Sequence, residues 1–183
     1  FKNDKAEARK GARRALGVTG LGGLCLLGGM LMLGDVVGSF ALTDVLAAHD
    51  RIIADSRYPY LLSLILLGVF TKSAQVPFHF WLPGAMSAPT PASAYLHSAT
   101  MVKAGVFLLV RFWPALSGTD LWFWLVTGVG MSTMVFAAFV ALFQRDIKGL
   151  LAYSTISHLG LITALAGLDT TMAVVAAIFH IIN

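Results

Sequence analysis

The chain has 183 residues, of which 57% are hydrophobic and only 12% are Asp, Glu, Lys or Arg. An ordinary soluble domain carries about 25% charged residues, and half that share cannot cover a surface that faces water. Composition therefore excludes a disordered chain, a coiled coil and an ordinary soluble enzyme domain, and it indicates a membrane protein. The single cysteine, Cys25, lies in an apolar run, which excludes a disulfide framework and a CxxC-type zinc site.

Five apolar segments are long enough to cross a membrane, and a sixth begins near the end of the sequence. A membrane-spanning helix needs about 20 predominantly apolar residues. The predicted spans are residues 16–33, 58–83, 91–113, 121–143 and 147–168, and the sixth starts at 171. The sequence thus predicts an all-α transmembrane, polytopic helix bundle. Because the chain opens on Phe1 and stops at Asn183 within an apolar run, we expect residues 1–183 to be a fragment of one larger transmembrane domain.

Basic residues between the spans predict the orientation in the membrane. Residues 1–14 carry six Lys or Arg and the turn at 144–148 carries two, whereas the loops expected on the opposite side hold only Arg51 and Arg57. This excess follows the positive-inside rule, and it accounts for the net charge of +4 without nucleic-acid binding. We therefore expect residues 1–14 to form a cytoplasmic basic loop, with 144–148 on the same side.

The segment 39–55, between the first two spans, has an amphipathic pattern. Its apolar side chains recur every three or four residues, and its Asp and Arg side chains take the opposite face. This pattern predicts a short helix that lies flat at the outer membrane interface. Packing on its own bundle is favoured over the docking of a partner.

Glycines crowd the first span, at positions Gly17, Gly20, Gly22, Gly23, Gly28 and Gly29. A nucleotide-binding loop would need a strand before the glycines and a helix after them. The sequence predicts neither here, so close helix–helix packing in lipid is the better interpretation.

Four predicted spans each place one basic ionisable side chain near the middle of the membrane. These side chains are Lys72, Lys103, His158 and His180, and His97 lies six residues before Lys103. A Lys at the bilayer centre costs on the order of 2.5–3.5 kcal/mol, and such groups usually face a bundle interior or a water-filled path. For any single histidine, a polar group satisfied by a neighbouring helix is an equally good interpretation. For the matched set we favour a proton relay, with a carboxylate partner supplied from outside the chain.

The second span should be broken by proline. Pro77 follows five residues after Lys72, and Pro83 ends the apolar run. Because proline removes a backbone donor and clashes with the preceding turn, we expect the helix to kink or break just after Lys72. If it stayed helical, Lys72, Gln75 and His79 would share one face. Broken helices at this depth are common at ion-handling sites of transporters.

No pattern in the sequence indicates chemistry on a substrate. Ser154 and His158 are one helical turn apart and can share a proton path, but no acid or nucleophile elbow accompanies them. The five histidines do not pair at the spacing of metal ligands. We therefore expect no cofactor and no metal site.

Three long motifs resemble those of a known family. They are KSAQVPFHFWLP at 72–83 leading into AMSAPTPASA at 85–94, HSATMVKAG at 97–105, and DIKGLLAYST at 146–155. On these motifs the chain resembles the antiporter-like membrane subunits shared by respiratory complex I and the Mrp-type multisubunit cation/proton antiporters. The 39–55 helix, Lys103, and His158 within STISHLG make it most similar to the large A-type subunits of the Mrp-type Na⁺/H⁺ antiporters.

The resemblance implies both a fold and a set of site residues. The fold would be a larger bundle of two inverted repeats, each with a proline-broken helix. Lys72 would be the central lysine of the first broken helix, paired with a glutamate outside this chain. His97 and Lys103 would belong to a lateral proton path, which His158 and His180 would continue.

The resemblance also implies a function. We expect a membrane subunit of a monovalent cation (Na⁺)/proton antiporter. Such a subunit is a component of a secondary transporter and not an enzyme. We expect it to be a multi-pass protein of the bacterial cell membrane. Expected partners are other membrane subunits of the antiporter complex, the lipid bilayer, protons and Na⁺. Two alternatives stay open: a proton-translocating L-type subunit of NADH–quinone oxidoreductase, and a non-transporting membrane scaffold. Central lysines argue against the scaffold, because a scaffold gains nothing from buried charge.

Overall fold

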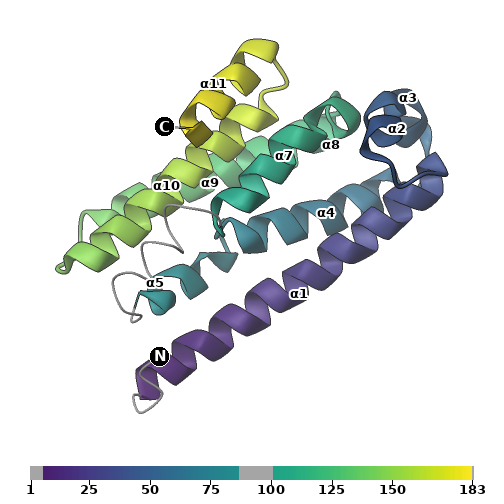
Figure 1. The fold of residues 1–183 in the computed structure, drawn as a ribbon. Coiled ribbons are helices and arrows are strands. Elements are labelled where there is room, and N and C mark those ends of the chain that lie inside the picture. Colours follow the sequence, from purple (N-terminus) through teal and green to yellow (C-terminus); the bar gives the residue numbers. More distant parts are fainter. Residues whose placement is uncertain (1–5, 87–100, 183) are drawn as a thin grey trace.

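The computed structural model describes residues 6–86 and 101–182, and every element within those ranges is helical (Figure 1). The longer helices are α1 (Ala6–Val37), α4 (Tyr58–Lys72), α7 (Lys103–Leu116), α9 (Gly128–Ala141), α10 (Ile147–Gly167) and α11 (Thr171–Ile182). Short pieces join them: α2 (Leu42–Ala47), α3 (His49–Ala54), the 3₁₀ turn η1 (Phe78–Phe80), α5 (Trp81–Ala85), α8 (Asp120–Trp122) and the π-helical η3 (Phe123–Thr127). The predicted all-α class is confirmed for these residues.

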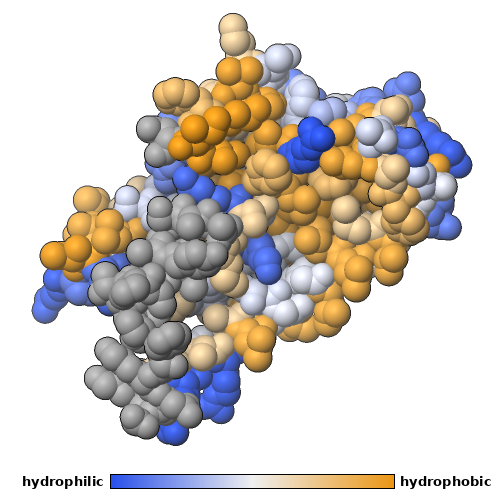
Figure 2. Space-filling model, viewed as in Figure 1, coloured by the Kyte–Doolittle hydropathy of each residue, from blue (hydrophilic) through white to orange (hydrophobic). Residues whose placement is uncertain are grey.

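Three helical stretches are long and apolar enough to cross a membrane. They are Ala8–Val37, Asp120–Ala141 and Ile147–Gly167. α4 and α11 are apolar but shorter. Hydrophilic residues gather at the ends of the molecule, and the visible surface between them is largely apolar with a few hydrophilic patches (Figure 2). The larger count of five complete spans and the start of a sixth stays a prediction.

The C-terminal helices begin where the sequence predicts. α10 starts at Ile147 because the Asp146 side chain accepts a hydrogen bond from Gly149 N at 2.8 Å and so caps the helix. α11 starts at Thr171, and Thr170 Oγ1 accepts a bond from Ala173 N at 3.3 Å. Local capping chemistry therefore fixes both boundaries.

The expected basic loop is wrong over most of its length. α1 begins at Ala6, so residues 6–14 are helical and the helix extends well before the predicted start at residue 16. The segment is rich in Ala, Lys and Arg, which are strong helix formers that can extend an apolar span into water. The cytoplasmic location of this end stays a prediction.

The single amphipathic helix expected over 39–55 is also wrong, because two short helices occupy the segment. α2 ends at Ala47, and Ala48 leaves the helical conformation with φ −96° and ψ 24° before α3 begins. Val45 on α2 and Ile52 on α3 are both buried in the same core cluster. The break lets both short helices turn their apolar side chains into the bundle, and the interfacial position stays a prediction.

Close backbone contact joins α1 and α4, which lie side by side in Figure 1. A Cβ at Gly29 would lie 2.7 Å from Ile65 Cγ1, and one at Gly68 would lie 2.5 Å from Leu26 Cβ. Gly22 likewise faces Thr71 with no room for a side chain. The packing interpretation of the glycine-rich span is therefore correct at Gly22 and Gly29, whereas Gly17 meets nothing within 4 Å.

An ion-pair network ties the end of α1 to the start of α4. Arg57 Nη1 donates to Asp35 Oδ2 at 2.7 Å, and its Nε and Nη2 donate to the Asp55 carboxylate at 3.2 Å each. These hydrogen bonds hold the pKa of Asp55 below its ordinary value and raise the pKa of Arg57.

Candidate functional site

A cavity of about 290 Å³ brings three of the predicted basic residues together. It is lined by Lys103, Ser154, Thr155, His158, Leu159, Ile162 and His180. Lys103 is the first residue of α7, His158 lies within α10, and His180 lies in the last turn of α11. The consecutive helices α10 and α11 and the earlier helix α7 therefore contribute one basic group each to one cavity.

The basic groups of the cavity are close enough to influence one another. The rings of His158 and His180 lie edge to face, with centroids 5.2 Å apart and an interplanar angle of 78°. Lys103 Nζ donates a hydrogen bond to Ile181 O at 2.9 Å, next to His180 in the sequence. His180 Nδ1 is buried and has no hydrogen-bond partner among the described residues. Imidazoles gain and lose protons near neutral pH, so this arrangement can relay a proton.

Packing against α9 fixes the position of His158. Ser157 Oγ donates to Met134 O at 3.0 Å, and Ile156 and Leu159 on either side are buried in the core. Ser154, one turn before His158, lines the same cavity, as its spacing suggested. The histidine is therefore presented by a helix whose rotation is set by its neighbours.

Lys103 differs from its expected place in the middle of a continuous helix. α7 begins at Lys103 and runs to Leu116, whereas the predicted span covered 91–113; residues 101–102 form a turn. Ser73 Oγ donates to Val102 O at 2.8 Å, which stabilises the turn from outside the helix. Lys103 consequently sits at a helix start, where its side chain reaches α11.

Side-chain hydrogen bonds stabilise the non-helical segment that follows Lys72. α4 ends at Lys72, the residue after which the proline pattern predicted a break. Val76 N donates to Thr133 Oγ1 on α9 at 3.0 Å, and Trp81 Nε1 donates to Thr71 O at 2.9 Å. Pro77 lies between α4 and η1. These bonds satisfy backbone groups that a continuous helix would have satisfied itself.

Two details of the broken segment correct the sequence analysis. Pro83 does not end the helical run, because it lies in the first turn of α5, where no backbone donor is needed. Lys72, Gln75 and His79 do not share one helical face, since the helix ends at Lys72. Gln75 is fully buried instead, with Nε2 donating to Ser73 O at 3.1 Å.

Lys72 does not line the cavity of the other basic groups. Its Cβ lies near Gly105 on α7, where an added Cβ would be 3.3 Å away, so Lys72 packs against the helix that carries Lys103. His97, the fifth predicted relay residue, lies outside the described residues.

Two residues of these helices, Thr133 and Arg111, were not predicted from the sequence. Thr133 is fully buried and bonds the broken segment, yet a lone threonine in an apolar helix carries no distinctive signal. Arg111 lies within the predicted third span and was overlooked, although its charge alone could have identified it. Within residues 6–86 and 101–182, no group of three or more His, Cys, Asp or Glu side chains could hold a metal ion.

The fold and the cavity define a multi-pass helical membrane protein with basic groups collected in a cavity lined by α7, α10 and α11. The family model for the transmembrane region of NADH:quinone oxidoreductase/Mrp antiporter proteins matches residues 1–183. The chain therefore belongs to the NADH:quinone oxidoreductase/Mrp antiporter family, and the predicted resemblance is confirmed. It is part of a multi-pass protein of a bacterial membrane.

Individual relatives support this membership. The chain is 61% identical over 97% of its length to a probable K(+)/H(+) antiporter subunit of the A/B type from Rhizobium meliloti. It is 45% identical over its whole length to a Na(+)/H(+) antiporter subunit of the A type from Bacillus subtilis. It spans 18% and 24% of these two relatives, respectively.

Two solved structures are similar. A structure of an Mrp complex from a Dietzia species has a TM-score of 0.93 and 44% identity, covering 99% of this chain and 20% of that one. A membrane-bound sulfane sulfur reductase, an archaeal respiratory membrane complex, has a TM-score of 0.87 and 28% identity, covering 100% of this chain and 38% of that one.

Proposed function

We propose that the full-length protein is the A-type membrane subunit of a multisubunit monovalent cation (Na⁺ or K⁺)/proton antiporter. This segment would carry protons through its Lys/His axis. The observation that supports the proposal is the shared cavity of Lys103, His158 and His180. The relatives that are named as antiporter subunits support the class of transport.

The proposed relay uses short steps between neighbouring basic groups. His158 and His180 accept and release protons one after the other. Lys103, beside them, changes the local positive charge as it gains or loses its own proton. The rings do not need a direct hydrogen bond, because a cavity of about 290 Å³ has room for several waters at roughly 30 Å³ each. His97 and Lys72 would extend the path beyond this cavity, toward the broken helix.

The proposal includes the wider setting of the protein. Other antiporter subunits would surround it in the membrane, and the cations exchanged would be protons and Na⁺ or K⁺. The protein would act as a component of a secondary transporter, without chemistry on a substrate. The broken helix and the five full spans with the start of a sixth would belong to a larger inverted-repeat bundle.

The test uses everted membrane vesicles that contain the full-length parent and the other membrane proteins of its complex. A pH-gradient dye is followed as Na⁺ or K⁺ is added. We expect His158→Gln to slow the cation-induced collapse of the gradient by about tenfold or more, since a positioned general acid or base typically contributes 10²–10⁴-fold to a proton-transfer step. His49→Gln is the control, because His49 lies on α3 and does not line the cavity. Equal transport in the two variants would contradict the relay.

A respiratory proton pump is the second candidate. It is favoured by the similarity to the archaeal respiratory membrane complex and by the family's NADH:quinone oxidoreductase members. If Na⁺ and K⁺ leave the gradient unchanged while NADH builds it through this complex, the pump is correct. If the complex assembles and transports normally with His158→Gln and Lys103→Met combined, the scaffold alternative is correct.

A further inference from the structure

The first helix, α1, is longer than a membrane is thick. Its 32 residues extend over about 48 Å, whereas the hydrocarbon core of a bilayer is about 30 Å thick. Residues 15–34 carry no charged side chain and by themselves extend over about 30 Å. Directly after this uncharged stretch, Asp35 pairs with Arg57. The hydrocarbon core therefore fits residues 15–34, and the helical residues 6–14 project beyond it at the N-terminal end.

Four exposed basic side chains gather on one face of this projecting end. They are Arg9, Lys10, Arg13 and Arg14. At about 100° per residue they fall within an arc of about 140° around the helix, and each lies three or four residues from another. None of them makes an ion pair or a hydrogen bond with another described residue. Like charges at this spacing destabilise a helix, and an anion bound between them removes that cost.

Packing on the other side of α1 fixes the direction of this basic face. Gly11 is buried, and a Cβ there would lie 2.6 Å from Gly84 O on α5. Gly11 projects about 130° away from the centre of the basic arc, and Gly22 and Gly29, which meet α4, project to nearly the same side as Gly11. Figure 1 shows α1 along the outer edge of the bundle. The basic face therefore points away from the other described helices.

The apolar side chains that continue this face are uncovered as well. Four leucines of the uncharged stretch fall within the same arc, and their exposed fractions are 54–68%: Leu21, Leu24, Leu27 and Leu31. Along one face of α1, a basic patch is thus followed by a row of exposed leucines at hydrocarbon depth. A phospholipid has the same order along its length, because an anionic phosphate is followed by apolar acyl chains.

The depth of the basic side chains matches that of lipid phosphates. Arg14 lies about 1.5 Å and Arg9 about 9 Å beyond residue 15, whereas the headgroup layer is about 5–7.5 Å thick on each side. Long basic side chains extend along the helix and adjust to the level of the headgroups. The positive-inside rule assigns this end to the cytoplasmic leaflet, whose anionic lipids attract basic segments next to a span.

We propose that this face of α1 binds an anionic phospholipid of the cytoplasmic leaflet. The phosphate lies among the basic side chains, where a guanidinium binds two of its oxygens through parallel hydrogen bonds. The acyl chains lie along the exposed leucines. The site selects the anionic headgroup by charge, and it selects a lipid over a free phosphate through the leucine row.

Photo-cross-linking identifies what covers the face. A benzophenone amino acid replaces Leu21 in the full-length parent within its complex, which is placed in nanodiscs of equal parts phosphatidylglycerol and phosphatidylcholine. Mass spectrometry identifies the cross-linked molecules. We expect phospholipid adducts, with phosphatidylglycerol at least about threefold more frequent than phosphatidylcholine. Adducts mainly on a polypeptide would overturn the proposal, because another helix then covers the face, and so would equal frequencies of the two lipids.

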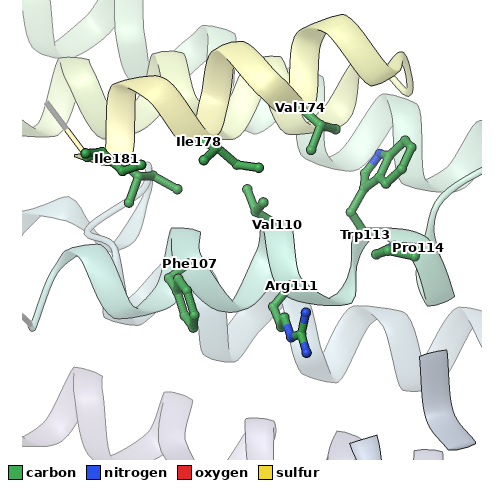
Figure 3. Close-up of a pocket in the computed structure, with 9 residues that line it drawn as sticks. Phe107, Val110, Arg111, Trp113, Pro114, Val174, Ile178 and Ile181 are labelled. Atoms are coloured by element: carbon green, nitrogen blue, oxygen red, sulfur yellow. The ribbon is translucent and has the colours of Figure 1, made fainter. Parts of the chain in front are cut away.

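Charge neutralisation tests the part played by the basic side chains. Arg13→Gln combined with Arg14→Gln should abolish most of the preference for phosphatidylglycerol, whereas Arg13→Lys combined with Arg14→Lys should retain most of it, since the charge is kept. The matched control is Arg111→Gln combined with Arg145→Gln, which also neutralises two exposed arginines. Arg111 lines an apolar groove beside α11 (Figure 3), and Arg145 lies in the turn between α9 and α10. This control should keep the full preference.

Salt provides a measurement that does not depend on how the variants assemble. At 1 M salt the Debye length is about 3 Å, so the parent itself should lose most of its preference for phosphatidylglycerol while lipid adducts continue to form. A preference that persists in the double Gln variant or at 1 M salt would show that the basic face does not hold the headgroup. Loss of the preference in the control would equally contradict the proposed site.

Discussion

Replacing Gly160 with alanine should force α9 and α10 apart. An added Cβ would lie 2.6 Å from Met134 N and 2.9 Å from Gly130 O. Both are backbone atoms, so no flexible side chain can move aside. Restoring an ordinary contact of 3.4 Å requires a shift of about 0.8 Å between the helices. Overpacking of this kind costs about 1–3 kcal/mol of the free energy of unfolding.

The same shift should affect transport, because His158 lies two residues from Gly160. Gly128→Ala on α9 is the control, since a Cβ there meets nothing within 4 Å. Alanine is favoured over glycine in a helix by up to about 1 kcal/mol, so this variant should be neutral or more stable. Thermal unfolding of the purified full-length parent measures stability, and the vesicle assay measures transport. We expect only Gly160→Ala to lower both.

Two outcomes would refute this reasoning in different ways. Equal melting temperatures for Gly160→Ala and Gly128→Ala would show that α9 and α10 do not touch at Gly160. A destabilised Gly160→Ala protein with full transport would show that the contact stabilises the fold without positioning His158.

Two further predictions concern contacts away from the cavity. Thr133→Val should cost about 1–3 kcal/mol of the free energy of unfolding, because Val76 N loses its partner, and Thr133→Ser should retain most of the stability; chemical denaturation of the parent measures both. For Asp55 the folded-state pKa is lowered by Arg57, so its contribution to stability is present above the ordinary value of 3.8 and is lost as the pH falls below it. At low salt, Asp55→Asn should therefore remove part of the fall in melting temperature that acid causes. If the melting temperature of Asp55→Asn falls with decreasing pH as much as that of the parent, Asp55 does not contribute to stability through this ion-pair network.

Helix boundaries could be predicted wherever local chemistry determines them. Asp146 caps α10 through its own side chain, and the proline pattern after Lys72 marks the place where α4 ends. The break at Ala48 had no such signal. It follows from the burial of Val45 and Ile52 against distant parts of the bundle, which a periodic pattern over one segment does not contain.

Membrane depth predicted the basic cluster only in part. The sequence predicted His158 and His180 at the same depth on two consecutive helices. In the structure their rings lie side by side, because α10 and α11 start where predicted and pack as neighbours. Lys72 stands at a helix end and does not line the cavity, and its part in a relay stays a prediction. The position of a residue along the membrane normal does not determine the direction in which its side chain points. Tertiary contacts, such as the hydrogen bond from Ser73 to Val102, determine that direction.

The start of α7 offers a physical link between Lys72 and the cluster. Gly105 allows α7 to approach the end of α4 so closely that an added Cβ would lie 2.8 Å from Val69 O and 3.3 Å from Lys72 Cβ. On the α4 side, Ser73 Oγ bonds the carbonyl just before Lys103. The helix end that carries Lys72 and the helix start that carries Lys103 are therefore held together by this hydrogen bond and by the close approach at Gly105. The two basic groups share no cavity, but the helices that carry them pack directly against each other.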